Sequence, residues 1–442
     1  MVNFNTVRCS IISYRGFITL ESHPLQYRRH YVQTTLTKQR ENYFLFTLAG
    51  IQFSHILDFM IMMPLGPVLI VELGISTHEF GLLVASYSFS AALSGLLAAT
   101  FIDRFERRKM LLTMFALFGF ATLACGLAPT YPALIIARGL AGTFGGIMGA
   151  MIQTMIADVI PFARRAKASG TVSAAFSVST VAGVPLSLWL SNHFNWRAPF
   201  ILIAVLVVLF MVAGWRALPE LRMHISSEKQ KHLFATIFTV LRDFNHLRAL
   251  LFSALIIFSG FTVIPYITVY AVGNVGISLQ EIPLIYLIGG AATLFTARII
   301  GHWSDICDKA KAYRLLAFGA IVPLLVVTHI EASPLWLWLL FTTLFFVLVS
   351  GRMIPAMTII TSAAQPILRG TFMSLNSTTQ SLAMGLATTL SGFIVSQDST
   401  GKMLNYGKVG YVAVAATLLA IWFVKSIIMH DPHAVIPDVA PK

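Results

Sequence analysis

The sequence predicts an all-α polytopic membrane protein with twelve transmembrane helices in two pseudo-symmetric six-helix bundles. Three observations support this fold class. The 442 residues are 57% hydrophobic and only 11% charged, whereas soluble domains are about 25% charged. The hydrophobic residues gather in long runs. Two of the polar segments between these runs resemble each other, and their aspartates lie 305 − 103 = 202 positions apart, near half of the chain.

Twelve apolar runs are long enough to cross about 30 Å of hydrocarbon, which takes about 20 helical residues. Helices are the expected form because lipid leaves backbone polar groups no external partners. The runs lie at 43–71, 80–102, 110–128, 132–156, 168–191, 198–217, 247–272, 283–302, 313–330, 335–363, 370–396 and 409–429. The predicted parts are a basic tail (1–42), an N-terminal bundle (43–217), a connector (218–246), a C-terminal bundle (247–429) and a second tail (430–442).

The first 42 residues are polar and basic and contain no apolar segment of a secretory signal. We expect a loose cytosolic tail, or residues added by an upstream start codon. An organelle transit peptide is the alternative. The connector carries charges of both signs and reads as an amphipathic bridge on the inner membrane surface.

The distribution of lysine and arginine predicts the orientation. With the first tail inside and the loops assigned alternately, 25 of the 31 lysines and arginines lie on the inner side and three in outer loops. The remaining three, Arg138, Arg298 and Arg352, fall within predicted spans. This is the positive-inside pattern, so we expect both termini in the cytoplasm. The net charge of +13 then has a membrane explanation, and no nucleic-acid partner is expected.

A polar hairpin follows the second run, and a weaker copy follows the eighth. Because such charges cannot lie in hydrocarbon, both hairpins are expected at the bilayer surface. We expect Asp103 to pair with charges at the start of the eleventh run and to form an inner gate; plain anchoring is the alternative. The residues assigned to this gate are Asp103, Arg104, Arg107, Arg108, Gly301, Asp305 and Arg369.

Asp58 lies within the first apolar run, where an ionised carboxylate costs at least a few kcal/mol. A carboxyl group that gains and loses a proton there is what proton coupling requires. His55 lies one helical turn before it, and Gln52 another turn back. Arg138 enters the fourth run from the outer side and keeps its charge. Asp58, His55 and Arg138 are therefore the candidate proton-coupling residues, with an aspartate that serves only packing as the alternative.

Polar residues within the runs suit a wet central cavity that binds a substrate. Arg352 lies deep in the tenth run, so it is difficult to explain as a residue that extends to the membrane surface. The residues assigned to substrate binding are Gln52, Gln153, Tyr266, Tyr270, Arg352, Asn376 and Gln380. Small residues allow close helix packing, and the residues assigned to it are Gly142, Gly146, Gly183 and Pro185.

The chain resembles the major facilitator superfamily over nearly everything after residue 42. Asp103, Arg104, Arg107 and Arg108 match its loop motif Gly-x-x-x-Asp-Arg-x-Gly-Arg-Arg, while Ala99 and Glu106 stand in place of glycines. The run Arg138-Gly-Leu-Ala-Gly142-Thr-Phe-Gly-Gly146 matches a pattern of proton-coupled members.

A third motif, Ala182-Gly183-Val184-Pro185, is similar to the antiporter motif of drug and sugar exporters, with Val184 in place of a glycine. Leu57-Asp58 with Pro64, and Gly351-Arg352-Met-Ile-Pro355, look most like bacterial drug/proton antiporters and sugar-efflux relatives. The resemblance implies a multi-pass protein of the plasma membrane, the bacterial inner membrane.

These observations predict a secondary transporter that exports a small organic molecule or drug in exchange for protons by alternating access. A proton symporter that imports a sugar, organic acid or siderophore is one alternative, and a non-transporting membrane sensor or scaffold is another. The sequence has no phosphate-binding loop, metal-ligand cluster or nucleophile triad, and its three cysteines are scattered. We therefore expect no enzyme activity, no cofactor and no metal. The expected partners are the substrate, protons and lipid, and the chain is expected to be a monomer.

Overall fold

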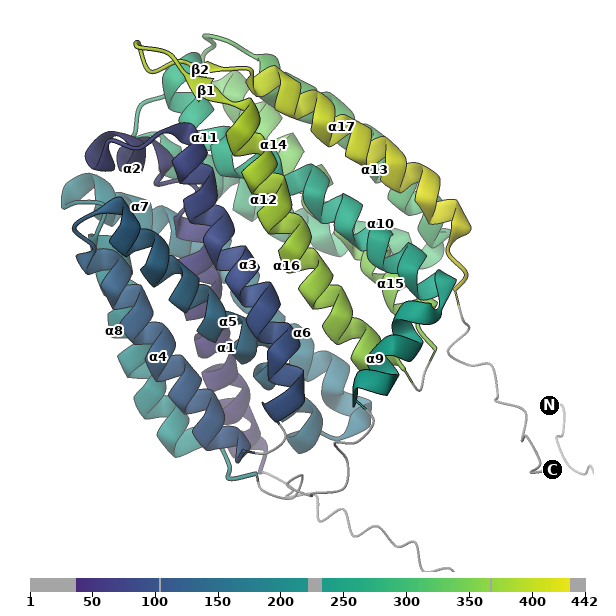
Figure 1. The fold of residues 1–442 in the computed structure, drawn as a ribbon. Coiled ribbons are helices and arrows are strands. Elements are labelled where there is room, and N and C mark those ends of the chain that lie inside the picture. Colours follow the sequence, from purple (N-terminus) through teal and green to yellow (C-terminus); the bar gives the residue numbers. More distant parts are fainter. Residues whose placement is uncertain (1–36, 103–104, 222–232, 366–367, 430–442) are drawn as a thin grey trace, which may run out of the picture. The chain divides into compact units, whose positions relative to one another are not determined.

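The computed structural model describes residues 37–102, 105–221, 233–365 and 368–429. The described part is almost entirely helical (Figure 1), which confirms the predicted all-α class. Before the connector the elements are α1 (Lys38–Ile61), α2 (Gly66–Leu73), α3 (Thr77–Phe101), α4 (Arg107–Leu127), α5 (Tyr131–Val159), α6 (Phe162–Val178), η2 (Ser179–Gly183), α7 (Val184–His193) and α8 (Ala198–Ala217).

From the connector onward the elements are α9 (Leu233–Arg242), α10 (Phe244–Phe261), η4 (Ile264–Tyr266), α11 (Ile267–Tyr270), η5 (Ala271–Val275), α12 (Ile282–Ile306), α13 (Lys309–His329), α14 (Leu335–Gly351), α15 (Met353–Ala363), α16 (Arg369–Ile394), β1 (Ser396–Gln397), β2 (Met403–Leu404), α17 (Tyr406–Phe423) and η6 (Val424–Ser426). The strands β1 and β2 form a small antiparallel hairpin between α16 and α17. The sequence analysis did not predict this hairpin.

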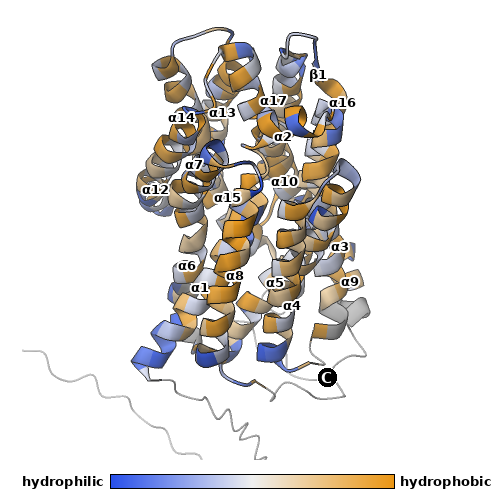
Figure 2. Ribbon diagram, turned by 90° about the vertical axis from the view of Figure 1, so that its left-hand side faces the viewer, coloured by the Kyte–Doolittle hydropathy of each residue, from blue (hydrophilic) through white to orange (hydrophobic). Residues whose placement is uncertain are grey.

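Eleven helices in the described residues are long and apolar enough to cross a membrane. They correspond to all of the predicted spans except the eleventh. That span forms α16, which has 26 residues but carries the polar stretch Asn376-Ser-Thr-Thr-Gln380 in its middle. With α16 included, the number of helical segments agrees with the predicted twelve. Figure 2 shows hydrophobic residues along the sides of the helices and hydrophilic residues at several helix ends.

Four of the predicted spans contain breaks that the apolar runs did not reveal. A turn with Pro64 separates α1 from α2, and the π-helical turn η2 separates α6 from α7. The seventh span changes helix type at η4, which contains Pro265, and again at η5. Arg352 separates α14 from α15, which has Pro355 in its first turn. Proline lacks a backbone N–H and crowds the preceding turn, so it interrupts the regular hydrogen bonding of a helix.

Two ends of the helical part can be distinguished by their residues. The hairpin end is the end that carries β1, β2 and the start of α3. The basic end is the end where Arg107, Arg164, Lys309 and Arg369 lie at the starts of α4, α6, α13 and α16. The predicted halves contact each other mainly along α3 and α16, which lie side by side in Figure 1, and where α12 meets η2 and α7.

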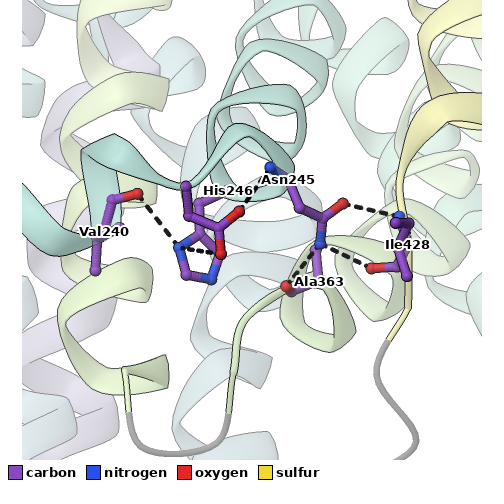
Figure 3. A network of polar contacts seen from close by, with 6 residues as sticks. Val240, Asn245, His246, Ala363 and Ile428 are labelled. Carbon is purple, nitrogen blue, oxygen red and sulfur yellow. Dashed lines mark hydrogen bonds and ion pairs between the residues drawn. The ribbon is translucent and has the colours of Figure 1, made fainter.

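Polar contacts with the backbone attach the end of the connector to the second half (Figure 3). The Asn245 side chain donates to the carbonyl oxygens of Ala363 and Ile428, at 3.0 and 2.9 Å, and accepts from the Ile428 N–H at 2.8 Å. His246 Nδ1 lies 3.3 Å from the Val240 carbonyl oxygen. Three segments distant in the sequence are thereby joined beside the start of α10. Residues 222–232 of the predicted bridge (218–246) lie outside the described residues.

Candidate functional site

The centre of the candidate site is an ion pair between α1 and α5. Arg138 Nη1 donates to Asp58 Oδ2 at 2.8 Å and to the Asp58 backbone carbonyl at 3.2 Å. Both side chains are fully buried. An isolated charge at such a place is strongly unfavourable, whereas a charge-assisted hydrogen bond offsets much of that penalty. The structure thus brings together two residues that the sequence analysis assigned to one function.

Tyr87 on α3 completes this centre and was missed by the sequence analysis. The Arg138 guanidinium carbon lies 4.5 Å from the centroid of the Tyr87 ring, a geometry that attracts a cation to an aromatic face. The ring of Phe59 packs on Tyr87 at 5.4 Å between centroids. Nothing in the local sequence distinguishes Tyr87 from other aromatic residues in apolar runs, because its partner lies on another helix.

Glycines on α5 allow this arrangement. A side-chain carbon at Gly142 would collide with the Tyr87 backbone, and one at Gly146 would collide with the backbone of Ala91. Backbones that approach this closely place residues of α3 and α5 within direct contact. Gly142 and Gly146, assigned to helix packing, therefore lie on the face of α5 that contacts α3.

Gly183 and Pro185 lie at the break in the fifth span. Gly183 ends the π-helical turn η2, and Pro185 occupies the first turn of α7. A side-chain carbon at Gly183 would lie 2.8 Å from a methyl carbon of Leu57. The Ser179 hydroxyl of the same turn donates to the Phe53 carbonyl at 3.3 Å. The break therefore packs directly against α1, next to Asp58.

His55 lies on the same helix as Asp58, one turn closer to the basic end. Its ring packs between Tyr87 and Phe118, with centroid distances of 6.1 and 6.0 Å. Gln52, a further turn away, is partly buried. His55 and Gln52 thus lie on the same side of α1 as Asp58, and Tyr87 on α3 packs against His55.

Arg352 lies in a different environment from Arg138. It is fully buried inside the second half, where it donates to the hydroxyls of Thr417 and Ser259 at 3.2 and 3.1 Å and to the Ile256 carbonyl at 3.3 Å. These partners, on α10 and α17, are neutral. The sequence analysis expected Arg352 to line a substrate cavity. The structure instead buries it among neutral partners within the second half.

The other residues assigned to substrate binding are not gathered at one place. Tyr266 is buried, and its hydroxyl donates to the Thr77 carbonyl at 3.0 Å at the hairpin end. Tyr270 packs against Tyr406, 4.7 Å away between ring centroids. Gln153 is exposed on α5 and accepts from the Ser169 hydroxyl.

Two polar residues of α16 remain near the middle of the second half. The Gln380 amide donates to the Ser253 hydroxyl at 3.0 Å. Asn376 is 2% exposed, and its side-chain oxygen has no hydrogen-bond partner among the residues that the structure describes. These two residues lie on the helix that contacts α3.

The gate residues lie at the basic end. Asp103 and Arg104 are outside the described residues. Arg107 Nε donates to Asp158 at 3.1 Å, and Arg108 lies 3.9 Å from Glu220. Asp305 pairs with Lys309 at 3.2 Å, and a side-chain carbon at Gly301 would meet open space. Arg369 Nε is buried without a partner in the described part of the chain; because Asp103 lies outside that part, its pairing with Arg369 stays a prediction.

Glu106, which replaces a glycine of the loop motif, has a clear structural role. Its carboxylate accepts from the backbone N–H groups of Arg108, Lys109 and Leu221 at 2.8, 2.9 and 3.1 Å. Burial opposes its ionisation, but these bonds and the Arg108 charge outweigh burial, so the pKa of Glu106 lies below its ordinary value. Glu106 thereby caps α4 and attaches the start of the connector to it.

Within the described ranges, no group of three or more His, Cys, Asp or Glu side chains could hold a metal ion. The site consists instead of one buried carboxyl group, one buried guanidinium cation and aromatic or hydroxyl neighbours. Such a site can bind and release a proton. Fold and site together define a multi-pass α-helical membrane protein with a buried ion pair in its first bundle.

Comparison with known proteins gives the family. The model of the major facilitator superfamily matches residues 48–388, so the chain belongs to this superfamily. It is 30% identical over 146 residues to the MFS-type transporter YfhI of Bacillus subtilis (strain 168), an alignment that covers 33% of this chain and 37% of the relative. It is 27% identical over 159 residues to the inner membrane transport protein YdhP of Escherichia coli (strain K12), covering 36% and 41%. The chain thus spans less than half of the length of these relatives.

Solved structures show the same fold. A bacterial homologue of the human lysosomal transporter Spinster, in an inward-facing and occupied conformation, matches with a TM-score of 0.71 and 15% identity over 90% of this chain and 100% of the other. A D-xylose-proton symporter matches with a TM-score of 0.68 and 17% identity over 87% and 97%. The family and its named relatives are membrane transporters and not enzymes.

Proposed function

We propose that this protein is a secondary active transporter that exports a small organic molecule in exchange for protons. The observation that carries the proposal is the buried ion pair of Asp58 and Arg138, with 2.8 Å between its charged atoms. A permanent cation next to an acid that can be neutralised gives a switch with two charge states. Membership of a transporter family makes transport the process that this switch controls.

The two charge states favour different conformations. With Asp58 ionised, the pair is neutral overall and stable in a dry environment. When a proton neutralises Asp58, the Arg138 charge loses its partner, and an unpaired buried charge costs several kcal/mol. Protonation therefore favours a conformation in which water or another group reaches Arg138. A population shift of this kind links proton binding to a conformational change.

Contacts between the halves support alternating access. At the hairpin end the Thr77 hydroxyl donates to the Val395 carbonyl at 3.2 Å, and Tyr266 donates to the Thr77 carbonyl at 3.0 Å. The Asn192 amide donates to the Leu279 carbonyl at 3.0 Å. These bonds join the halves at one end, and alternating access requires them to break as the opposite end closes. From the lysine and arginine pattern we place the hairpin end outside the cell and both termini inside.

The cargo site is proposed between the halves, beside the ion pair. We assign its hydrogen-bonding groups to Gln52 on α1 and to Asn376 and Gln380 on α16. Gate functions for Asp103, Arg104, Arg107, Arg108, Asp305 and Arg369 belong to the same proposal. In this scheme the protein acts as a monomer.

Transport in vesicles containing the purified chain tests the proposal. Cationic dyes and uncharged drugs form the first panel of cargo, and an imposed pH gradient is the driving force. Asp58→Asn should abolish gradient-driven transport while folding and membrane insertion remain normal. Glu72→Gln, which removes an exposed acid near the end of α2, is the matched control. Unchanged gradient-driven transport in Asp58→Asn would refute the assignment of proton coupling to Asp58.

The direction in which cargo moves relative to protons distinguishes the proposed antiport from its main alternative, symport. In the proposed antiport, cargo moves against the flow of protons, whereas a symporter for a sugar, organic acid or siderophore moves cargo with it. The similarity in fold to a D-xylose-proton symporter keeps symport as the second candidate. A membrane sensor would move no cargo under either gradient.

A further inference from the structure

We infer that Tyr87 and His55, held close together by Gly145, form the route by which protons travel between Asp58 and the basic end. This inference rests on the proposed function and adds a positioning residue and a direction to it. Tyr87 acts through its hydroxyl, which orients a water molecule. His55 is the next proton carrier along α1.

Gly145 reveals how close these groups are. A side-chain carbon built at Gly145 would lie 2.6 Å from the Tyr87 hydroxyl and 2.7 Å from His55 Nε2. The two atoms are therefore at most 2.6 + 2.7 = 5.3 Å apart. One water molecule that lies to the side of the Gly145 backbone can bridge two atoms this close, with hydrogen bonds of about 2.7 Å. Any residue larger than glycine would place its side chain between them.

Polar atoms around this point need further partners. The Tyr87 hydroxyl and His55 Nδ1 are both buried and have no hydrogen-bond partner among the described residues. Buried polar groups in native proteins are almost always paired with protein or ordered water. Two unpaired groups, on α1 and α3 beside Gly145 of α5, therefore indicate a hydrated site within the first half.

The position of His55 on α1 gives the direction in which the proton moves. His55 precedes Asp58 by three residues on α1, a rise of about 4.5 Å along the helix. The start of α1 lies at the basic end, where Glu41 pairs with Arg164 at 2.8 Å. A proton that moves from Asp58 to His55 therefore moves toward the basic end.

The proton moves from Asp58 to His55 through one water molecule. The protonated Asp58 carboxyl gives its proton to the water molecule, which gives one of its own protons to His55. The products are the Asp58 carboxylate, a neutral water molecule and an imidazolium, which passes its proton on to water at the basic end. The Tyr87 hydroxyl accepts and donates hydrogen bonds to this water without changing its own charge.

The titratable groups that face this site come from all four packed helices. They are His55 and Asp58 on α1, Tyr87 on α3, Cys125 on α4 and Arg138 on α5. Arg138 keeps its charge, and a thiol and a phenol ordinarily stay protonated near neutral pH. Asp58 and His55 are therefore the two groups that exchange the proton.

The experiment follows Asp58 directly and requires no cargo. The full chain is placed in nanodiscs of phosphatidylethanolamine and phosphatidylglycerol, and the infrared absorption of protonated carboxyl groups is recorded after a pH jump. The band absent from Asp58→Asn belongs to Asp58. Tyr87→Phe, which keeps the ring under Arg138, should slow the change in this band at least about tenfold, as expected for the loss of a positioned proton-transfer group. Gly145→Ala and His55→Gln should slow it as well.

Two matched variants control for packing. Tyr313→Phe removes another buried tyrosine hydroxyl that has no partner in the described residues, and Gly149→Ala adds a methyl group on α5 where nothing lies within 4 Å. Both should leave the rate unchanged. Equal rates in wild type, Tyr87→Phe and Gly145→Ala would overturn the route but leave the proposed function intact. A wild-type protein without a pH-dependent Asp58 band would overturn the proton switch and the route together.

Discussion

Arg138 and Arg352 are equally buried, but the protein stabilises their charges differently. Arg138 has the carboxylate of Asp58, whereas the partners of Arg352 in the described chain are oxygen atoms of Ser259, Thr417 and Ile256. Hydrogen bonds to a charged group contribute about 1.5–3 kcal/mol each. Arg352 therefore depends on hydroxyl groups that look unremarkable in the sequence.

Because Arg352 depends on these hydroxyl groups, we expect their removal to destabilise the protein more than removal of the arginine itself. The double variant Ser259→Ala with Thr417→Val should lower the free energy of unfolding by about 2–4 kcal/mol, because it leaves a buried charge poorly solvated. Arg352→Met should destabilise less, because it removes the charge and leaves the 2.6 Å bond between Ser259 and Thr417 intact. Thermal unfolding in detergent measures the order.

Thr342→Val, which removes a buried hydroxyl bonded within its own helix, is the control for that series. If Arg352→Met proves the most damaging of the variants, the guanidinium itself holds α10, α14 and α17 together. The prediction would then be wrong.

The sequence revealed Asp58, Arg138 and Arg352 because a charge in an apolar run stands out wherever the chain folds. It did not reveal Tyr87, Ser259 or Thr417, because their importance comes from neighbours on other helices. Arg352 also shows the limit of that reasoning. Depth in a span identified a buried residue, but its direction within the bundle is set by tertiary packing.

At the scale of single elements, Glu106 connects α4 to the connector. Both oxygens of its carboxylate accept from backbone N–H groups, and Leu221 both donates to Glu106 and accepts from the Arg107 N–H. The loop motif of the family has glycine here. Arg108 reinforces the contact by donating to the Trp215 carbonyl at the end of α8.

The low pKa of Glu106 determines how the stability contributed by its carboxylate changes with pH. A carboxyl whose pKa is depressed by folding contributes stability that is fully present above its ordinary value of 4.5 and is lost as the pH falls through its folded value. Wild type should therefore unfold at a higher temperature than Glu106→Gln near neutral pH. The difference should shrink as the pH falls below about 4.5. A difference that stays constant from neutral to acidic pH would show that the Glu106 charge contributes nothing.

The elements themselves were partly predictable. All twelve spans correspond to helical segments because hydrophobic length is a property of consecutive residues. The interruptions at η2, η4 and η5 were not located. Where a helix changes type depends on which neighbouring helix presses against it, as Leu57 does at Gly183.

At the scale of the whole described chain, two glycines control how the halves meet at the hairpin end. The Tyr266 hydroxyl lies 2.2 and 2.8 Å from where side-chain carbons of Gly81 and Gly392 would be, too close for either to be added without displacement. The ring of His78 packs on Phe393 beside them, 4.3 Å apart between centroids. Contact between the halves at this point therefore requires residues without side chains.

Gly81→Val should displace Tyr266, break its bond to Thr77 and separate the halves at the hairpin end. Spin labels at Glu72 and Thr400, in a chain without its native cysteines, measure this separation. The labelled distance should become longer than in wild type. Gly170→Val, where nothing lies within 4 Å, is the control. Identical distance distributions in both variants would show that the hairpin end tolerates the added side chain and that Gly81 does not hold it closed.

The neutral surroundings of Arg352 have an electrical consequence. A fixed positive charge inside the membrane cannot be discharged by any change in acidity, so it responds to the voltage across the bilayer. The work is about 2.3 kcal/mol for one elementary charge moved through 100 mV. Any movement that shifts the second half along the membrane normal therefore becomes voltage-dependent in proportion to the distance that Arg352 travels.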